Sequence, residues 1–148
     1  MRKGGGKQKG ASFEREICKK LSLWLSNGAV EDVLWRSAMS GGRSTVAAAK
    51  GKRLAAQAGD ISCIHPIGHY FCDVFMLECK HYADLRYSGI LTRKGHLVEF
   101  WKTANREAAR YNKRPLMIAK QNQLPIVVCL DRDGLNILNL KFKCTMTA

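Results

Sequence analysis

The sequence lacks an apolar stretch long enough to span a membrane, and no apolar segment of signal-peptide type follows its basic first residues. We therefore expect the protein to stay in the compartment in which it is made. It also lacks any Cys-x-x-Cys pair, although it contains 6 cysteines. Most of these cysteines lie in apolar runs, which predicts reduced thiols packed as small core residues in a reducing cytosol, without disulfides.

Acidic residues are scarce: 12 Asp and Glu stand against 25 Lys and Arg, a formal charge of +13. This excess predicts a polyanionic partner, nucleic acid before a membrane surface, but it does not separate an enzyme from a structural binding protein. Residues 1–10 contain no acid and are predicted to be a flexible basic arm that contacts DNA through Lys3, Lys7 and Lys9. The hydrophobic fraction of 46% predicts a globular body, which we expect to be one domain over residues 11–148.

Hydrophobic spacing predicts two helices. The first begins at Ala11 with Ser12 as N-cap and ends near Asn27-Gly28. Its apolar face comprises Phe13, Ile17, Cys18, Leu21, Trp24 and Leu25. Glu14 and Glu16 fall in its predicted first turn, where the helix dipole favours carboxylates. The second helix covers about residues 96–112, with Leu97, Trp101, Ala104, Ala108 and Tyr111 on one face.

The strand candidates, in chain order, are residues 33–36, 60–64, 71–80, 115–119, 124–130 and 135–142. Residues 65–69 are predicted to be the turn of an antiparallel hairpin between the second and third of these strands. Helices and strands in this order predict an α/β fold with a mixed sheet and helices packed on it.

Three charged residues are predicted to meet at one end of that hairpin. Period-two alternation places Glu78 and Lys80 on the same face of their strand, and Asp60 begins the neighbouring strand. Two carboxylates, with the backbone carbonyl of Cys79 between Glu78 and Lys80, offer the oxygen ligands that Mg²⁺ prefers, and Mn²⁺ is expected to substitute. Lys80 could orient or deprotonate an attacking water, or neutralise charge on phosphorus. The simplest alternative is a salt bridge at the end of the strand.

Two other interpretations use sulfur and imidazole groups. A structural zinc site could use the side chains around the predicted turn, Cys63, His65, His69 and Cys72, although their spacing lacks the paired knuckles of common zinc sites. A nucleophilic cysteine could be formed by Cys79 with His81, but the sequence shows no oxyanion element to accompany it.

Four short blocks resemble the PD-(D/E)xK nucleases, and among them the archaeal-type Holliday-junction resolvases and their phage relatives. The blocks are residues 9–16 (KGASFERE), 35–41 (WRSAMSG), 59–61 (GDI) and 77–80 (LECK). The resemblance implies a restriction-endonuclease-like mixed sheet flanked by helices. It further implies a homodimer that cuts branched DNA, located in the cytoplasm, or in the host cytoplasm if a phage encodes it.

Residue by residue, the resemblance implies that Glu14 completes a metal site with Asp60 and Glu78, and that Lys80 is the catalytic lysine. Arg15 and Arg36 match basic residues associated with DNA binding, and Ser37 and Ser40 lie in the mobile loop of the family. This chain differs by a basic insertion at about 41–58, which we expect to face nucleic acid. Its basic residues are Arg43, Lys50, Lys52 and Arg53.

From these observations we expect a Mg²⁺-dependent, structure-selective DNA endonuclease that resolves four-way junctions by paired phosphodiester hydrolysis. The alternatives are another PD-(D/E)xK nuclease, acting on flaps, ends or duplex DNA, and a non-catalytic basic module that binds nucleic acid.

Overall fold

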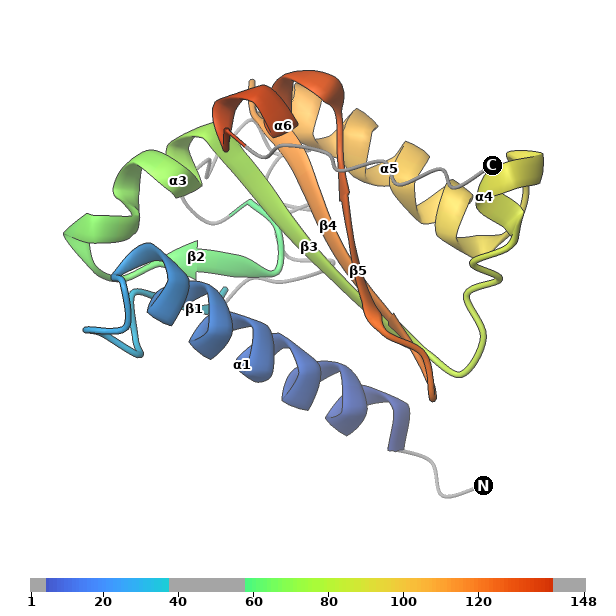
Figure 1. The fold of residues 1–148 in the computed structure, drawn as a ribbon, viewed down its shortest axis with the longest axis horizontal. Helices are drawn as coiled ribbons and strands as arrows, with labels where there is room; N and C mark the ends of the chain where they lie inside the picture. Colours follow the sequence, from blue (N-terminus) through green and yellow to red (C-terminus); the bar gives the residue numbers. More distant parts are fainter. Residues whose placement is uncertain (1–4, 38–57, 140–148) are drawn as a thin grey trace, which may run out of the picture.

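The structure, a computed structural model, describes residues 5–37 and 58–139 and contains one mixed five-stranded sheet with helices on both faces (Figure 1). The strands are β1 (Leu34–Arg36), β2 (Ile61–Cys63), β3 (Phe75–Tyr82), β4 (Arg114–Gln121) and β5 (Ile126–Leu130). They lie side by side in the order β1-β2-β3-β4-β5. Only β3 and β4 are parallel, and the other neighbours pair antiparallel. The predicted α/β class is therefore confirmed.

The helices are α1 (Gly5–Leu25), α3 (His69–Val74), α4 (Gly89–Thr92), α5 (His96–Arg110) and α6 (Arg132–Ile137), with a 3-10 turn, η2 (Pro66–Gly68), before α3. Helix α5 connects β3 to β4, because a parallel pair requires a crossover. Helices α1 and α5 lie on opposite sides of the sheet (Figure 1). Neither these helices nor any other described helix is long and apolar enough to cross a membrane.

Alternation along β3 divides the core between these two helices. Phe75, Leu77 and Cys79 pack with the buried residues of α1, namely Phe13, Ile17 and Cys18. Met76 points to the other face, where it packs against Ala108 of α5. The apolar faces predicted for the two helices therefore bury the opposite faces of one sheet. Trp24 is the exception, because half of its surface is exposed although its ring contacts Phe71 edge-on at 5.9 Å.

The start of α1 differs from the prediction. The helix begins at Gly5, so residues 5–10 are helical rather than part of a flexible arm, and Ser12 is an exposed residue inside the helix. Glycines 6 and 10 lower helix propensity, which is why the sequence pattern placed the start after them. A hydrogen bond from Lys9 Nζ to Asn122 Oδ1 attaches this segment to the turn after β4. Residues 1–4 lie outside the described residues.

The hairpin prediction is correct in its pairing and wrong in its connection. Strands β2 and β3 are antiparallel, with Ile61 opposite Leu77. However, residues 71–74 belong to α3, and the predicted turn is η2 followed by the start of that helix. Pro66 occupies the first turn of η2, and the His65 side chain caps it by accepting from Ile67 N. A short apolar run bounded by such signals has no periodicity that separates strand from helix.

The last predicted strand is also wrong where it is described. Residues 132–137 form α6, and Asp131 caps it by accepting from Gly134 N at 2.6 Å. The sequence DRDG therefore starts a helix rather than a turn between strands, because its first aspartate satisfies a free helix N–H. Residues 140–142 lie outside the described residues, as does the predicted insertion except for its last residue, Ala58. Ala58 is 5% exposed and packs in the core beside Met76.

Candidate active site

The predicted site lies where the pairing between β2 and β3 ends. The backbone N–H of Asp60 donates to Leu77 O at 2.8 Å. The next free N–H of β3 on this side, that of Cys79, donates to Oδ2 of the Asp60 side chain at 2.8 Å instead of to a backbone carbonyl of β2. The N–H and C=O groups of one strand residue point to the same side. The backbone carbonyl of Cys79 therefore faces the same edge as the Asp60 carboxylate.

Gly59 explains how Asp60 reaches this position. Its φ of +85° is in the left-handed region, and a Cβ on it would collide with the carbonyl oxygen of Leu77 and lie 3.1 Å from the Met76 side chain. Only glycine allows the chain to pass this close to β3 while turning into β2. A glycine immediately before Asp60 is therefore required by the local backbone.

Glu78 and Lys80 share the face of β3 that α5 covers. Lys80 Nζ pairs with Glu78 Oε1 at 2.6 Å, and it lies 5.2 Å from the ring centroid of Phe100 on α5. This cation–π contact was not predicted, because the pairing of a strand lysine with a helix ring depends on the crossover geometry. The ring and the carboxylate together hold the ammonium at the edge.

Glu14 reaches the site from α1. The Arg36 guanidinium of β1 donates from Nε to Glu14 Oε2. Because α1 begins at Gly5, Glu14 and Glu16 both lie beyond the first turn, so the helix-dipole explanation for them is wrong. Glu16 instead pairs with Lys20 at 2.9 Å. Glu14 therefore lies beside β1, and it lines the same cavity as Asp60.

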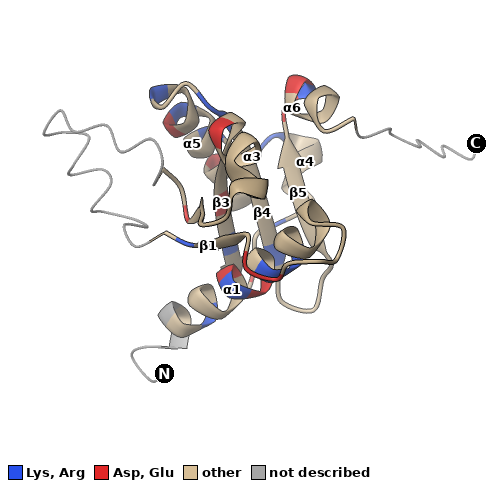
Figure 2. Cartoon of the chain, turned by 90° about the vertical axis from the view of Figure 1, so that its left-hand side faces the viewer, with Lys and Arg blue, Asp and Glu red and all other residues tan. Residues whose placement is uncertain are grey.

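One cavity of about 770 Å³ lies at this edge of β3. Its lining includes Glu14, Asp60, Cys79 and Lys80, together with Lys9 and His81. Glu78 is close enough to act electrostatically on Asp60. Acidic and basic positions are interspersed on α1 and on α5 (Figure 2).

The charges at this edge oppose one another. Burial, followed by the negative charge of Glu78, raises the pKa of Asp60 to about 7. Burial also raises the pKa of Glu78, although Lys80 opposes the shift. Burial by itself would lower the pKa of Lys80, but the charges of Glu78 and Asp60 outweigh burial and raise it. In the metal-free site these carboxylates favour the ammonium form of Lys80, which is the form that neutralises charge or orients water.

The carboxylates fit a hard divalent cation in chemistry, and two of them must reorient to bind one. Within residues 5–37 and 58–139, no three His, Cys, Asp or Glu side chains form a group that could hold a metal as they stand. Glu14 and Glu78 are instead turned to their basic partners, Arg36 and Lys80. A cation among Glu14, Asp60, Glu78 and the Cys79 carbonyl would have only oxygen ligands and would relieve their repulsion.

The remaining predicted DNA contacts are distributed unevenly. Arg15 is exposed on α1, whereas Ser37 is 5% exposed and its N–H donates to Asp60 O at 2.8 Å. A surface contact between Ser37 and DNA does not fit this burial. Lys7 lies in α1, and the other predicted contacts fall outside the described residues: Lys3, Ser40, Arg43, Lys50, Lys52 and Arg53.

The two rival interpretations lack support. The Cys63 thiol donates to His65 O at 2.8 Å and His65 Nδ1 accepts from Ile67 N, so these two groups are already used in the turn. Together with the lack of any three-residue metal group in the described chain, this argues against a zinc site. Cys79 is 8% exposed, and burial and nearby carboxylates raise its pKa well above the usual value, which disfavours a nucleophilic thiolate.

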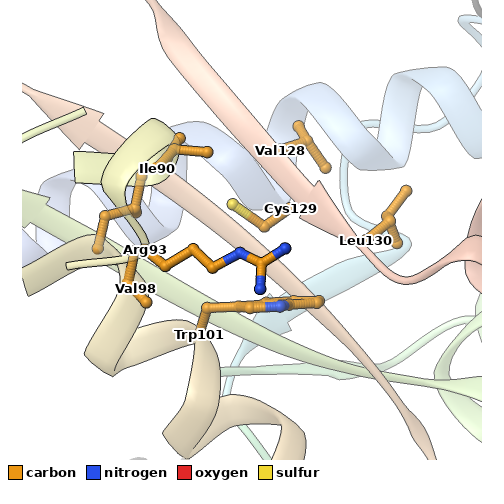
Figure 3. A pocket seen from close by; sticks show the side chains of 8 residues that line it. Ile90, Arg93, Val98, Trp101, Val128, Cys129 and Leu130 are labelled. Atoms are coloured by element: carbon orange, nitrogen blue, oxygen red, sulfur yellow. The ribbon is translucent and has the colours of Figure 1, made fainter. Parts of the chain in front are cut away.

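A second cavity, of about 350 Å³, lies between α4, α5 and β5. Its lining is mostly apolar, and the Arg93 guanidinium lies over the Trp101 ring, facing Val128 and Cys129 of β5 (Figure 3). It has no carboxylate in its lining, and none of its residues belongs to the Asp60 edge. The chemistry described above therefore belongs to the larger cavity.

One comparison with known proteins gives a match. The sequence model of one family, described as "Phage putative PDDEXK endonuclease", matches residues 5–148. No curated protein and no solved structure matched the chain. The match includes α1, the sheet and the residues at the edge of β3 that we call the carboxylate edge: Glu14, Asp60, Glu78, Cys79 and Lys80.

Proposed function

The chain belongs to the phage PD-(D/E)xK endonuclease family, and from that premise we propose that it is a Mg²⁺-dependent endonuclease that resolves four-way DNA junctions. The observation that carries the proposal is the edge of β3. There a helix carboxylate, a strand-start aspartate, a backbone carbonyl and a half-buried lysine lie around one cavity. Nucleases of this superfamily generally use divalent metal ions, and the all-oxygen donor set favours Mg²⁺, with Mn²⁺ as a substitute.

A divalent ion bound by Glu14, Asp60, Glu78 and the Cys79 carbonyl would supply Lewis-acid chemistry and lower the pKa of bound water. The side chains of the protein would do the rest. Lys80, whose ordinary form at neutral pH is the ammonium, would orient the attacking water or stabilise negative charge on the phosphate. Phe100 keeps that ammonium at the edge when Glu78 turns away from it.

Arg36 has a related role in the proposal. In the structure it neutralises Glu14. If Glu14 held a metal ion, the Arg36 guanidinium would lose that partner and would become available to a DNA phosphate. The same residue would thus protect the carboxylate before binding and contact the substrate afterwards.

The choice of substrate rests on charge and on resemblance. The formal charge of +13 favours a polyanion. The resemblance of four short sequence blocks to archaeal-type resolvases favours a branched junction, and a homodimer that nicks two strands symmetrically. The basic insertion, with its arginines and lysines, is proposed to contact the arms of the DNA.

The test is a cleavage assay on three DNAs of matched sequence: a four-way junction, a flap and a linear duplex. Each is incubated with Mg²⁺, Mn²⁺, Ca²⁺ or EDTA. We expect paired, symmetric nicks in the junction with Mg²⁺ or Mn²⁺, and no cleavage in EDTA. If every DNA is bound and none is cut with any of these metals, the endonuclease proposal is wrong. If linear duplex or flap is cut as fast as the junction, only the junction assignment fails.

A further inference from the structure

The cavity that holds the carboxylates has a basic end. Lys9 of α1 and His81 of β3 both line it. In the parallel register of β3 and β4, His81 lies opposite Lys120. Burial, followed by the positive charges of Lys9 and Lys120, lowers the pKa of His81, so both lysines are near the imidazole. Three basic side chains from three different elements therefore meet at one place.

The positive charge at this end is only partly offset by the described residues, because the charge of Glu16 acts on both Lys120 and His81. The partner of Lys9 is the neutral amide of Asn122. Glu16 lies 4.0 Å from Lys120, but it is paired more closely with Lys20, at 2.9 Å. His81 Nδ1 is buried and has no hydrogen-bond partner in the described part of the chain. An unsatisfied buried polar atom in a basic cluster is a place where a ligand or an ordered water completes the network.

The floor of the cavity leaves room for a backbone to approach. Gly6 and Gly10 line it one above the other on α1, and Glu14 continues the same row. A Cβ built on either glycine would meet no atom of the described residues within 4 Å. Each glycine costs a helix about 1 kcal/mol relative to alanine. Since the residues that the structure describes do not require their small size, these two positions fit a ligand that passes close to α1 on its way to Glu14.

We propose that Lys9, His81 and Lys120 form a phosphate subsite, which binds a DNA phosphate near the one hydrolysed at the carboxylate end. The identity of the ligand rests on the proposed function. The two ends differ in their need for metal: the carboxylates repel a phosphate until a cation is bound, whereas the basic end attracts it without one. The subsite therefore supplies part of the affinity for DNA in EDTA.

The first measurement is binding of the synthetic four-way junction and of linear duplex in EDTA, over a series of salt concentrations. Lys9→Gln/Lys120→Gln is compared with a matched pair, Lys19→Gln/Lys102→Gln. The control lysines are exposed and each pairs with one carboxylate, at 3.1 and 2.9 Å. We expect the subsite variant to bind about tenfold more weakly than the control variant, with a salt slope smaller by about one. Equal affinities and equal slopes would overturn the subsite.

The second measurement locates the phosphate. Uncharged methylphosphonate linkages are placed one at a time along the DNA, and binding is measured for each. For the control variant, one linkage near the nick should weaken binding about tenfold, and for the subsite variant the same linkage should have little further effect. If both variants lose affinity equally at every linkage, the subsite does not exist. A wild-type protein that binds DNA in EDTA but cuts none with metal would refute the proposed function instead, and the binding comparison would still decide the subsite.

Discussion

Replacing Asp60 by asparagine should make the metal-free protein more stable at alkaline pH. Asparagine keeps an acceptor for Cys79 N–H, which Asp60 Oδ2 now provides at 2.8 Å, and removes the charge. A pKa raised from 3.8 to about 7 corresponds to about 4 kcal/mol of unfolding free energy that the ionised carboxylate removes. At pH 8 in EDTA we expect the free energy of unfolding of Asp60→Asn to exceed that of wild type by about 2 to 4 kcal/mol. The lower end of this range applies because part of the repulsion is carried by Glu78.

The dependence on pH follows from the direction of the shift. Below a pH of about 4 the carboxyl is neutral in both states and costs nothing. As the pH rises to about 7 the unfolded chain ionises first, so the wild-type protein loses stability over this range, and above it the loss is constant. The advantage of Asp60→Asn should therefore shrink to less than half between pH 8 and pH 5.

Urea unfolding at pH 5 and pH 8, with EDTA or with Mg²⁺, measures these differences. The matched control is Asp32→Asn, since Asp32 is exposed, and it should change stability by less than about 0.5 kcal/mol. Mg²⁺ should stabilise the wild-type protein and not Asp60→Asn, because binding to the folded state adds to stability. If Asp60→Asn is no more stable than wild type at pH 8, or if its advantage is the same at both pH values, then burial and the charge of Glu78 do not destabilise the ionised Asp60 carboxylate.

Two further predictions concern the backbone that supports the site. Gly59→Ala places a side chain on a residue with left-handed backbone, against β3. It should lower the free energy of unfolding in urea by at least about 2 kcal/mol and reduce cleavage by displacing Asp60. Unchanged stability would contradict the close approach of Gly59 to β3. Ser22→Ala removes the hydroxyl that accepts from Leu34 N at 2.9 Å, so thermal unfolding should show a loss of about 1 to 3 kcal/mol, with cleavage per folded molecule unchanged. A loss below about 0.5 kcal/mol would mean that the buried N–H finds another partner.

The parts of the site that the sequence predicted are those governed by local pattern. Alternation placed Glu78 and Lys80 on one face, and the antiparallel pairing of β2 with β3 brought Asp60 beside them. Glu14 could be assigned only by resemblance, because spacing within one helix does not say which loop or strand its side chain will meet. Its partner Arg36 is distant in the sequence and lies on another element.

The parts that the sequence could not predict depend on contacts between distant segments. The start of α1 at Gly5 goes against helix propensity and accompanies the Lys9–Asn122 contact. Phe71 and Cys72 are buried by a helical turn, although the run that contains them has the composition of a strand. The contact of Phe100 with Lys80 arises from the crossover that places α5 over β3.

Single-turnover cleavage of the four-way junction with Mg²⁺, by wild type and by three variants, tests the central claim most directly. The variants are Asp60→Asn, Lys80→Ala and the control Asp32→Asn, each at a concentration that saturates the DNA. If the reaction takes place at the carboxylate edge, the first two variants should bind the junction but lose at least about 10³-fold in cleavage rate. The control should cut at the wild-type rate. Cleavage by Asp60→Asn or Lys80→Ala near the wild-type rate would contradict the account, because the reaction would then occur elsewhere in the protein.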